Sequence, residues 1–151
     1  MIGCAVYTSN QLVDYSIRLQ KQKWSSTKKD RFLSTILSFI KIYTITDIAL
    51  AIPHAYYQTP ECKELIDAIE SLSTRNGVSI AKYSMESVYR AFGNRVKPTR
   101  ASLIKRMVLF YEELERYETK ELQNKHKYYI KLFEAVACGS IHVLALQEKQ
   151  G

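Results

Sequence analysis

The alternation of apolar and polar residues at the start of the chain predicts a β-hairpin. Small and β-branched residues fill positions 3–8, a Ser-Asn pair follows as a turn signal, and positions 12–18 alternate again. Val13, Tyr15 and Ile17 fall on one face of the second strand and polar residues on the other, which is typical of a half-buried antiparallel pair.

The pattern changes to helical spacing after a polar connector. Apolar residues between Phe32 and Tyr43 recur three and four positions apart, and a serine or threonine at 25–27 can cap the helix that they predict. The continuous apolar run 48–52 is typical of a short strand that is covered on both faces.

Strand and helix signals continue through the rest of the chain. Thr59 and Pro60 begin a helix that Asn76-Gly77 ends, and residues 78–83 predict another strand. Three further helices are expected: a short one capped by Ser84, one capped by Thr99 that carries apolar residues as far as Leu114, and a last one over Leu122–Leu144 with Gly139 inside it.

This order of elements predicts an α/β fold. A hairpin followed by alternating helices and strands gives a mixed sheet, in which an antiparallel hairpin joins parallel strands, with helices on both faces. A chain of 151 residues can bury one core without disulfides or metals, so we expect residues 1–151 to form a single domain.

Basic residues outnumber acidic ones, and they are concentrated in one part of the chain. The net charge is +7 and the pI is near 9.3, which suits a nucleic-acid partner, although a soluble protein can also be basic without one. Residues 82–106 hold seven basic residues and one acid, whereas residues 112–121 hold five glutamates. We therefore expect one face to contact phosphates, through Arg90, Arg95, Lys97, Arg100, Lys105 and Arg106.

Several classes of protein are disfavoured by what the sequence lacks. Cys4, Cys62 and Cys138 are far apart and form no CxxC motif, which argues against a zinc site or a disulfide framework and fits a reducing cytoplasm. No apolar run approaches the ~20 residues of a membrane span, and no signal-peptide pattern is visible, so we expect a cytoplasmic protein without a membrane partner. The motifs of serine hydrolases, phosphate-binding loops and zinc peptidases are also missing.

The serial order of the elements resembles the RuvC-type Holliday junction resolvases, which have the RNase H-like fold. Five stretches carry the resemblance and cover nearly the whole chain: GCAVYTSNQLVDYSIR, DRFLSTILSFIKIYTITDIALAI, LIDAIESLSTRNGVSIAKYSMESVYRAFG, TRASLIKRMV and FEAVACGSIH. The resemblance implies an RNase H-like mixed sheet and action on branched or structured DNA in recombination or repair. It also implies a homodimer, because a two-fold junction presents two symmetric cuts.

The same resemblance implies a nuclease site that has lost most of its acids. The family cuts DNA with two magnesium ions held by three or four carboxylates. Its first acid lies on a strand before the hairpin, and Pro53 stands where a glutamate ends its central strand. Lys131 and Glu134 stand where its closing helix carries acids at i and i+3. Glu134 is thus the one candidate catalytic and metal-binding remnant, unless it is a solvated helix residue, and magnesium is expected only if the protein is active.

A histidine and four tyrosines near the expected strand ends are further candidates. His54 could act as a weak metal ligand or base, or it could be a loop residue with a satisfied hydrogen bond. Tyr56, Tyr57, Tyr83 and Tyr89 could stack on unpaired bases or pack at the rim of the core.

Three functions are open from the sequence. The first is a DNA-binding domain with a degenerate nuclease site, cytoplasmic or associated with the nucleoid, that binds four-way junctions or similar DNA. The second is an active magnesium-dependent endonuclease whose first strand is missing from this chain, which should leave a gap or an exposed edge in the sheet. The third is a protein-interaction scaffold that keeps the fold without the chemistry.

Overall fold

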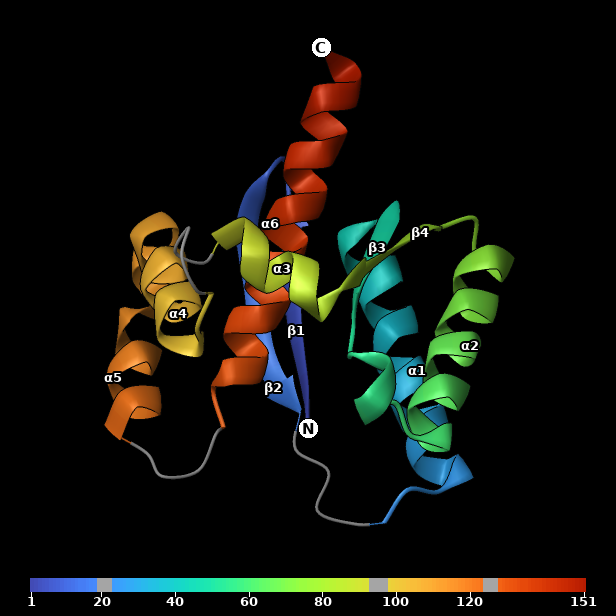
Figure 1. Cartoon of the computed structure of the whole chain (residues 1–151). Helices are drawn as coiled ribbons and strands as arrows, with labels where there is room; N and C mark the ends of the chain where they lie inside the picture. The colour runs from blue at the N-terminus through green and yellow to red at the C-terminus, as the bar shows by residue number, and fades with distance from the viewer. Residues whose placement is uncertain (19–22, 93–97, 124–127) are drawn as a thin grey trace.

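The structure is a computed structural model that describes residues 1–18, 23–92, 98–123 and 128–151. Within these ranges it contains four strands and six α-helices, and Figure 1 shows the strands near the middle with helices on either side. The predicted α/β class is confirmed, including the antiparallel hairpin, the parallel strands and the helices packed on them.

The predicted hairpin consists of β1 (Ile2–Thr8) and β2 (Gln11–Arg18), which pair antiparallel. Ser9 and Asn10 have φ angles of 49° and 65°, so both turn residues are in the left-handed region. Two-residue hairpin turns favour this conformation because its twist matches that of the strands. The Ser-Asn signal in the sequence therefore predicted both the turn and its position.

A β-bulge changes which face of β2 each side chain occupies. The register shifts before Tyr7, which faces Leu12 and leaves Val13 as an extra residue that is 48% exposed. Tyr15 and Ile17 pack against the core together with Leu12. The prediction that Val13 shares their face is wrong, because strict alternation does not allow for one inserted residue.

The second pair of strands is parallel and is connected through a helix. β3 (Asp47–Ile52) and β4 (Ser79–Ser84) pair along their whole length, and η1 (Ala55–Tyr57) and α2 (Pro60–Arg75) lie between them in the chain. The Thr59 side chain accepts a hydrogen bond from the first turn of α2, which confirms the predicted cap.

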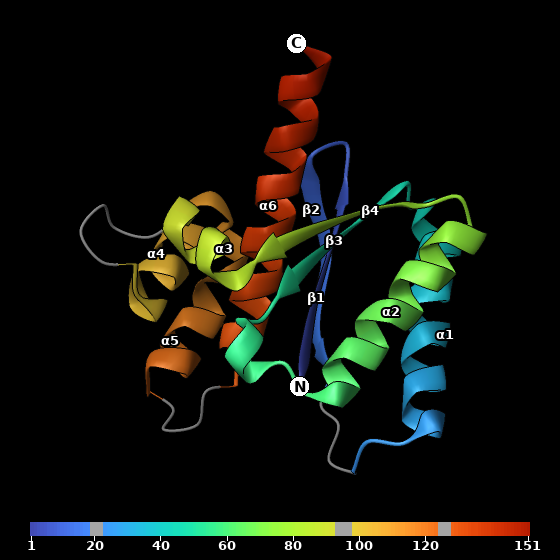
Figure 2. The same cartoon turned by 45° about the vertical axis from the view of Figure 1, so that its right-hand side comes forward.

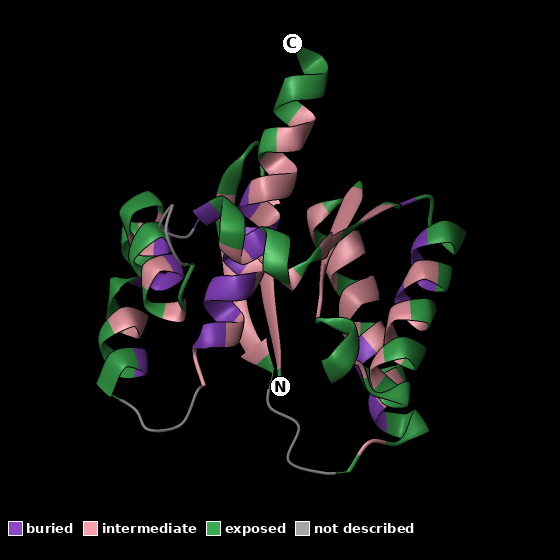
Figure 3. Cartoon of the chain, viewed as in Figure 1, coloured by how far each residue is buried: buried purple, intermediate pink, exposed green. Residues whose placement is uncertain are grey.

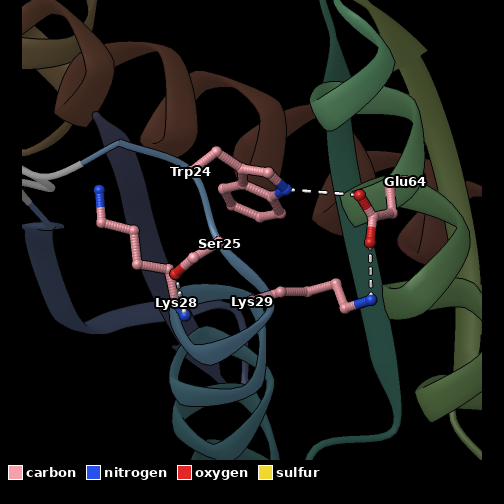
Figure 4. A network of polar contacts seen from close by, with 5 residues as sticks. All are labelled: Trp24, Ser25, Lys28, Lys29 and Glu64. Atoms are coloured by element: carbon pink, nitrogen blue, oxygen red, sulfur yellow. Dashed lines mark hydrogen bonds and ion pairs between the residues drawn. The ribbon is translucent and has the colours of Figure 1, made fainter.

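The helix before β3 packs against α2. This helix, α1 (Ser26–Tyr43), is capped by Ser25, which lies within the predicted range 25–27. Figure 4 shows the polar contacts between the starts of the two helices: Lys29 Nζ lies 2.7 Å from Glu64 Oε1, and the Trp24 indole N–H donates to Glu64 Oε2 at 3.4 Å. The hydrogen bond from Lys29, with that from Trp24, holds the pKa of the Glu64 carboxyl below its usual value.

The two strand pairs are separate sheets in the described part of the chain, rather than one continuous mixed sheet. β1 pairs with β2 and β3 with β4, so β1 and β3 each have one edge without a described strand beside it. The apolar run of β3 is accordingly half-buried along its length, where the sequence predicted cover on both faces. α6 (Ile130–Gln150) packs against both β1 and β3 and holds the sheets next to each other.

Two of the predicted C-terminal helices are confirmed with their caps, although the second ends at Phe110 and the predicted Leu114 lies in a separate 3-10 turn. α3 (Met85–Phe92) begins after Ser84, whose hydroxyl accepts a backbone hydrogen bond from its first turn. α4 (Arg100–Phe110) begins with a capping box, in which the side chains of Thr99 and Ser102 each accept from the other residue's backbone N–H.

The predicted last helix is two helices in the structure. Leu122 lies in α5 (Glu115–Gln123), which follows the 3-10 turn η2 (Glu112–Leu114), whereas Leu144 lies in α6. α5 holds only two apolar residues, Tyr117 and Leu122, so apolar spacing did not identify it as a separate helix. Gly139 does not interrupt α6, and its missing side chain leaves room for the Tyr7 ring.

The core is built around the first half of α6. Figure 3 shows buried residues concentrated there and on the facing helices, whereas the second half of α6 extends beyond the rest of the molecule. By length and composition α6 could cross a membrane, but its first half is the central helix of this core. The buried cluster consists of Val88, Phe92, Leu103, Ile104, Met107, Leu114, Ile130, Leu132, Phe133, Val136, Ala137 and Cys138.

Candidate nucleic-acid interface

Five of the predicted site residues come from two segments that follow the parallel strands. Residues 54–57 follow β3 and residues 85–92 follow β4, and we call these two segments the strand-end region. Because β3 and β4 are parallel, their carboxyl ends meet at one edge of the sheet. Open α/β proteins bind ligands at the carboxyl ends of their strands, so we expect a binding site here.

His54 caps the short helix that carries the two tyrosines. Its Nδ1 accepts a hydrogen bond from the Tyr56 backbone N–H at 3.2 Å, and its side chain is otherwise exposed. The Gln58 side chain donates to the Pro53 carbonyl at 2.9 Å and fixes the same turn. These contacts match the loop alternative for His54, and none of its described hydrogen bonds is to a carboxylate.

Tyr56 and Tyr57 are the most exposed aromatic side chains that the structure describes. They are 85% and 72% exposed, and their rings meet edge to face with centroids 5.3 Å apart. Tyr83 and Tyr89 pack against the core instead. Tyr83 and Tyr89 therefore match the alternative of packing at the core. Tyr56 and Tyr57 do not, because this pair presents its rings to solvent.

Glu134 is buried on α6, only 7% exposed, and both of its carboxylate oxygens have partners. The Tyr89 hydroxyl donates to Oε1 at 3.0 Å and the Lys131 ammonium donates to Oε2 at 3.1 Å. The alternative of a solvated helix residue is wrong. Burial, together with the negative charge of Glu134, raises the pKa of the Tyr89 hydroxyl, which stays protonated and donates to the carboxylate.

The surroundings of Glu134 do not fit a magnesium site. The Lys131 ammonium already occupies one side of the carboxylate, and a second cation there would be repelled. In the part of the chain that the structure describes, no group of three or more His, Cys, Asp or Glu side chains could hold a metal ion. A two-metal reaction requires several carboxylates, so we derive no metal-dependent step from these residues.

The described residues of the predicted basic run differ in their surroundings. Arg90 is exposed but forms an ion pair with Glu86 one turn earlier on α3. Lys105 and Arg106 lie exposed on α4 and have no ion-pair partner among the described residues. Arg95 and Lys97 lie outside the described residues. Lys105 and Arg106, both on α4, are thus available to contact phosphates.

The Arg100 side chain is 34% exposed but turns its Nη1 inward to a buried carboxylate, so it is less available to phosphates than the sequence predicted. Its Nη1 lies 3.3 Å from Oε1 of the fully buried Glu121, without the alignment of a hydrogen bond, so we describe the contact as an ion pair. No sequence pattern predicts this pairing, because Glu121 stands in a glutamate-rich stretch that is typical of a solvated face.

A histidine that the sequence did not single out links α6 to the parallel sheet. His142 Nδ1 lies 2.9 Å from the Tyr83 hydroxyl, and its Nε2 lies 3.4 Å from Asp47 Oδ1. Burial raises the pKa of the Tyr83 hydroxyl, which therefore stays protonated. The chain separates these three residues widely, and no local pattern predicts that they meet.

Comparison of the chain with models of known protein families and with curated proteins finds no significant match.

Proposed function

We propose that this protein binds nucleic acid, with Tyr56 and Tyr57 stacking on unpaired bases and the cations of α4 contacting phosphates. The exposed tyrosine pair carries the proposal. Two adjacent aromatic rings in solvent do not stabilise the fold by burial, whereas every nucleobase offers a face on which such rings can stack. The net charge of +7 supplies the attraction that any nucleic-acid contact requires.

In its more specific form, the proposal is a RuvC-like domain that binds branched DNA such as four-way junctions and has a degenerate nuclease site. Support comes from the order of the elements and from Pro53 and Lys131 at two positions where the resolvase family has acids. The occupied oxygens of Glu134 add to it, because a carboxylate held by Tyr89 and Lys131 is not free to bind metal.

A binding titration with three DNA forms tests the proposal. The protein is titrated against a four-way junction, a duplex and a single strand at ~50 mM salt, where phosphate contacts are strong. Stacking contributes about 1–3 kcal/mol per base, so Tyr56→Ala with Tyr57→Ala should weaken binding to unpaired bases at least about tenfold. Duplex affinity should change little, because stacked bases are not accessible to the rings.

Ile42→Ala is the matched control, because it truncates another exposed apolar side chain, on α1. Equal losses in the tyrosine and Ile42 variants would remove the stacking role. Affinity no better than that of a neutral protein for all three DNA forms would overturn the proposal as a whole.

A cleavage assay separates the degenerate site from an active endonuclease. The junction is incubated with the protein and magnesium or manganese, and we expect no product. Glu134→Gln is the useful variant, since it preserves the size of the side chain, removes its charge and keeps one oxygen that can accept a hydrogen bond from Tyr89 or from Lys131. Cleavage by the wild type that disappears in Glu134→Gln would support the active endonuclease and contradict the proposal of a degenerate nuclease site.

A further inference from the structure

All four described strands have one free hydrogen-bonding edge, and the free edges of β1 and β3 point to a binding surface. β1 pairs with β2 and β3 pairs with β4, and we call β1 and β3 the inner strands. The described residues provide no backbone hydrogen bond to the other edge of either one. Such an edge exposes a row of N–H and C=O groups that an extended chain can pair with.

The register of β3 identifies the free groups. The Ser79 N–H donates to the Thr46 carbonyl at 2.9 Å, which fixes how the parallel pair is bonded. In a parallel ladder, alternate residues bond to the same neighbour, so the backbone groups of Ile48 and every second residue after it face β4. The N–H and C=O groups of Ala49 and Ala51 therefore face the free edge.

The composition of β1 and β3 is typical of strands inside a sheet and not of strands at its edge. Natural edge strands are protected by charged residues, and the outer strands fit this rule with Asp14 and Arg18 on β2 and Lys82 on β4. β1 has no charged residue, and β3 has only Asp47 at its first position. These inner strands have the composition of strands that are paired on both sides.

The placement of α6 shows that the two free edges belong to one surface. α6 packs against β1 and β3, and a helix with its side chains is about 10–12 Å wide, roughly two strand spacings. Figures 1 and 2 show β1 leading away from the N-terminus while β3 runs the opposite way, toward η1. One strand placed between them would be antiparallel to one neighbour and parallel to the other.

We propose that the edges of β1 and β3 bind one extended polypeptide segment of a partner protein, which pairs with both strands and joins the two sheets. Only a polypeptide backbone repeats donors and acceptors at the spacing of these edges. β3 has six residues and β1 has seven, which sets the segment at about six residues. The segment is apolar on both faces, because the strands on either side of it are. This proposal does not depend on DNA binding.

The test uses a synthetic peptide with the centre Val-Ala-Ile-Ala-Val-Ala and two serines at each end. Its control has proline in place of the central isoleucine, which removes one N–H and disrupts the extended pairing. Binding is followed by amide hydrogen exchange in the full chain. We expect the first peptide to slow exchange at Ala49, Ala51 and β1 at least about tenfold, and the proline peptide to leave exchange unchanged.

A matched pair of protein variants examines the same edge. Ala51→Pro removes an N–H that faces away from β4, so the β3–β4 ladder keeps its bonds while the peptide should bind about tenfold more weakly. Ala51→Ser keeps the N–H and should bind as the wild type does. If Ala51→Pro does not fold, the comparison of the two peptides still decides.

Three results would overturn the proposal. One is unchanged exchange at about 1 mM peptide, where even weak strand addition should be populated. Another is equal protection by both peptides. The third is a stable dimer by light scattering whose Ala49 and Ala51 amides are already protected without peptide, because a second copy would then cover the edges.

Discussion

At the scale of single residues, Glu121 shows how a buried charge can organise a fold. Its Oε2 accepts hydrogen bonds from the backbone N–H groups of Tyr128 at 3.2 Å and Tyr129 at 2.8 Å, and its Oε1 faces Arg100. A buried carboxylate is tolerated only when such partners compensate for its lost hydration. Glu121 therefore connects the end of α5 to the start of both α4 and α6.

Removing this carboxylate should cost more stability than any exposed substitution nearby. Glu121→Ala leaves Arg100 and two backbone donors unpaired, so the free energy of unfolding should fall by about 3–5 kcal/mol. Glu121→Gln keeps an acceptor oxygen and should lose less, about 1–3 kcal/mol. Urea denaturation followed by circular dichroism measures both.

Glu115→Ala is the matched control, because Glu115 is exposed on the same helix and its change should stay within about 0.5 kcal/mol. A loss in Glu121→Ala no larger than in this control would mean that the buried carboxylate contributes nothing.

The buried thiol of Cys138 gives a prediction with a pH dependence. Burial raises its pKa to about 12, so at pH 8 only about one thiol in ten thousand is ionised. The contribution of the protonated, buried thiol to the free energy of unfolding is complete below the pKa of an unfolded thiol, about 8.5, and is lost as the pH rises toward 12. Iodoacetamide at pH 8, with mass spectrometry, should label the half-buried Cys62 and leave Cys138 free until the protein unfolds. Equal labelling rates in the folded protein would contradict the burial of Cys138.

At the scale of helices and strands, the sequence was informative where the signal is local. Thr59, Ser84 and Thr99 each cap the helix that they were predicted to cap, and the cap predicted at 25–27 is Ser25, because a cap depends on residues within one turn. The break between α5 and α6 was missed. It depends on which residues meet in the core, and apolar spacing carries no such information.

The exposed cations of α4 give a prediction that separates position from total charge. Lys105→Gln with Arg106→Gln removes two charges from one turn of α4, so affinity for DNA should fall and the salt slope should decrease by about 1–2. Lys41→Gln with Lys63→Gln removes the same total charge from α1 and α2, on exposed positions. Titrations at several salt concentrations compare the pairs, and equal losses would show that net charge, and not α4, governs binding.

At the scale of the whole molecule, the candidate site was predicted only in part. The positions of Tyr56 and Tyr57 at a strand end followed from the chain order of strand and loop. The inward turn of the Arg100 Nη1 and the contact of Tyr89 with Glu134 could not be predicted, because each depends on a residue from another helix. The division into two sheets is also non-local, since one strand's pattern does not show whether both of its edges are paired.

The uneven distribution of buried residues predicts that the protein opens in parts. The core cluster comes from α3, α4, η2 and α6, whereas α1 and α2 contribute no residue to it and bury few apolar side chains, among them Phe32 and Ile69. Regions with few buried contacts open at lower free energy than the core. Native-state hydrogen exchange should therefore be at least about tenfold faster in α1 and α2 than in the first half of α6.

Two variants test whether this difference reflects separate units. Phe32→Ala should accelerate exchange in α1 and α2 and leave α6 nearly unchanged, because Phe32 lies outside the core cluster. Phe133→Ala opens a cavity in the fully buried centre, costs about 3–5 kcal/mol, and should accelerate exchange everywhere. If Phe32→Ala accelerates α6 as much as α1, the whole chain opens in one step. The outer pair of helices then depends on the core as strongly as α6 does, through the β3–β4 sheet that α2 and α6 both contact.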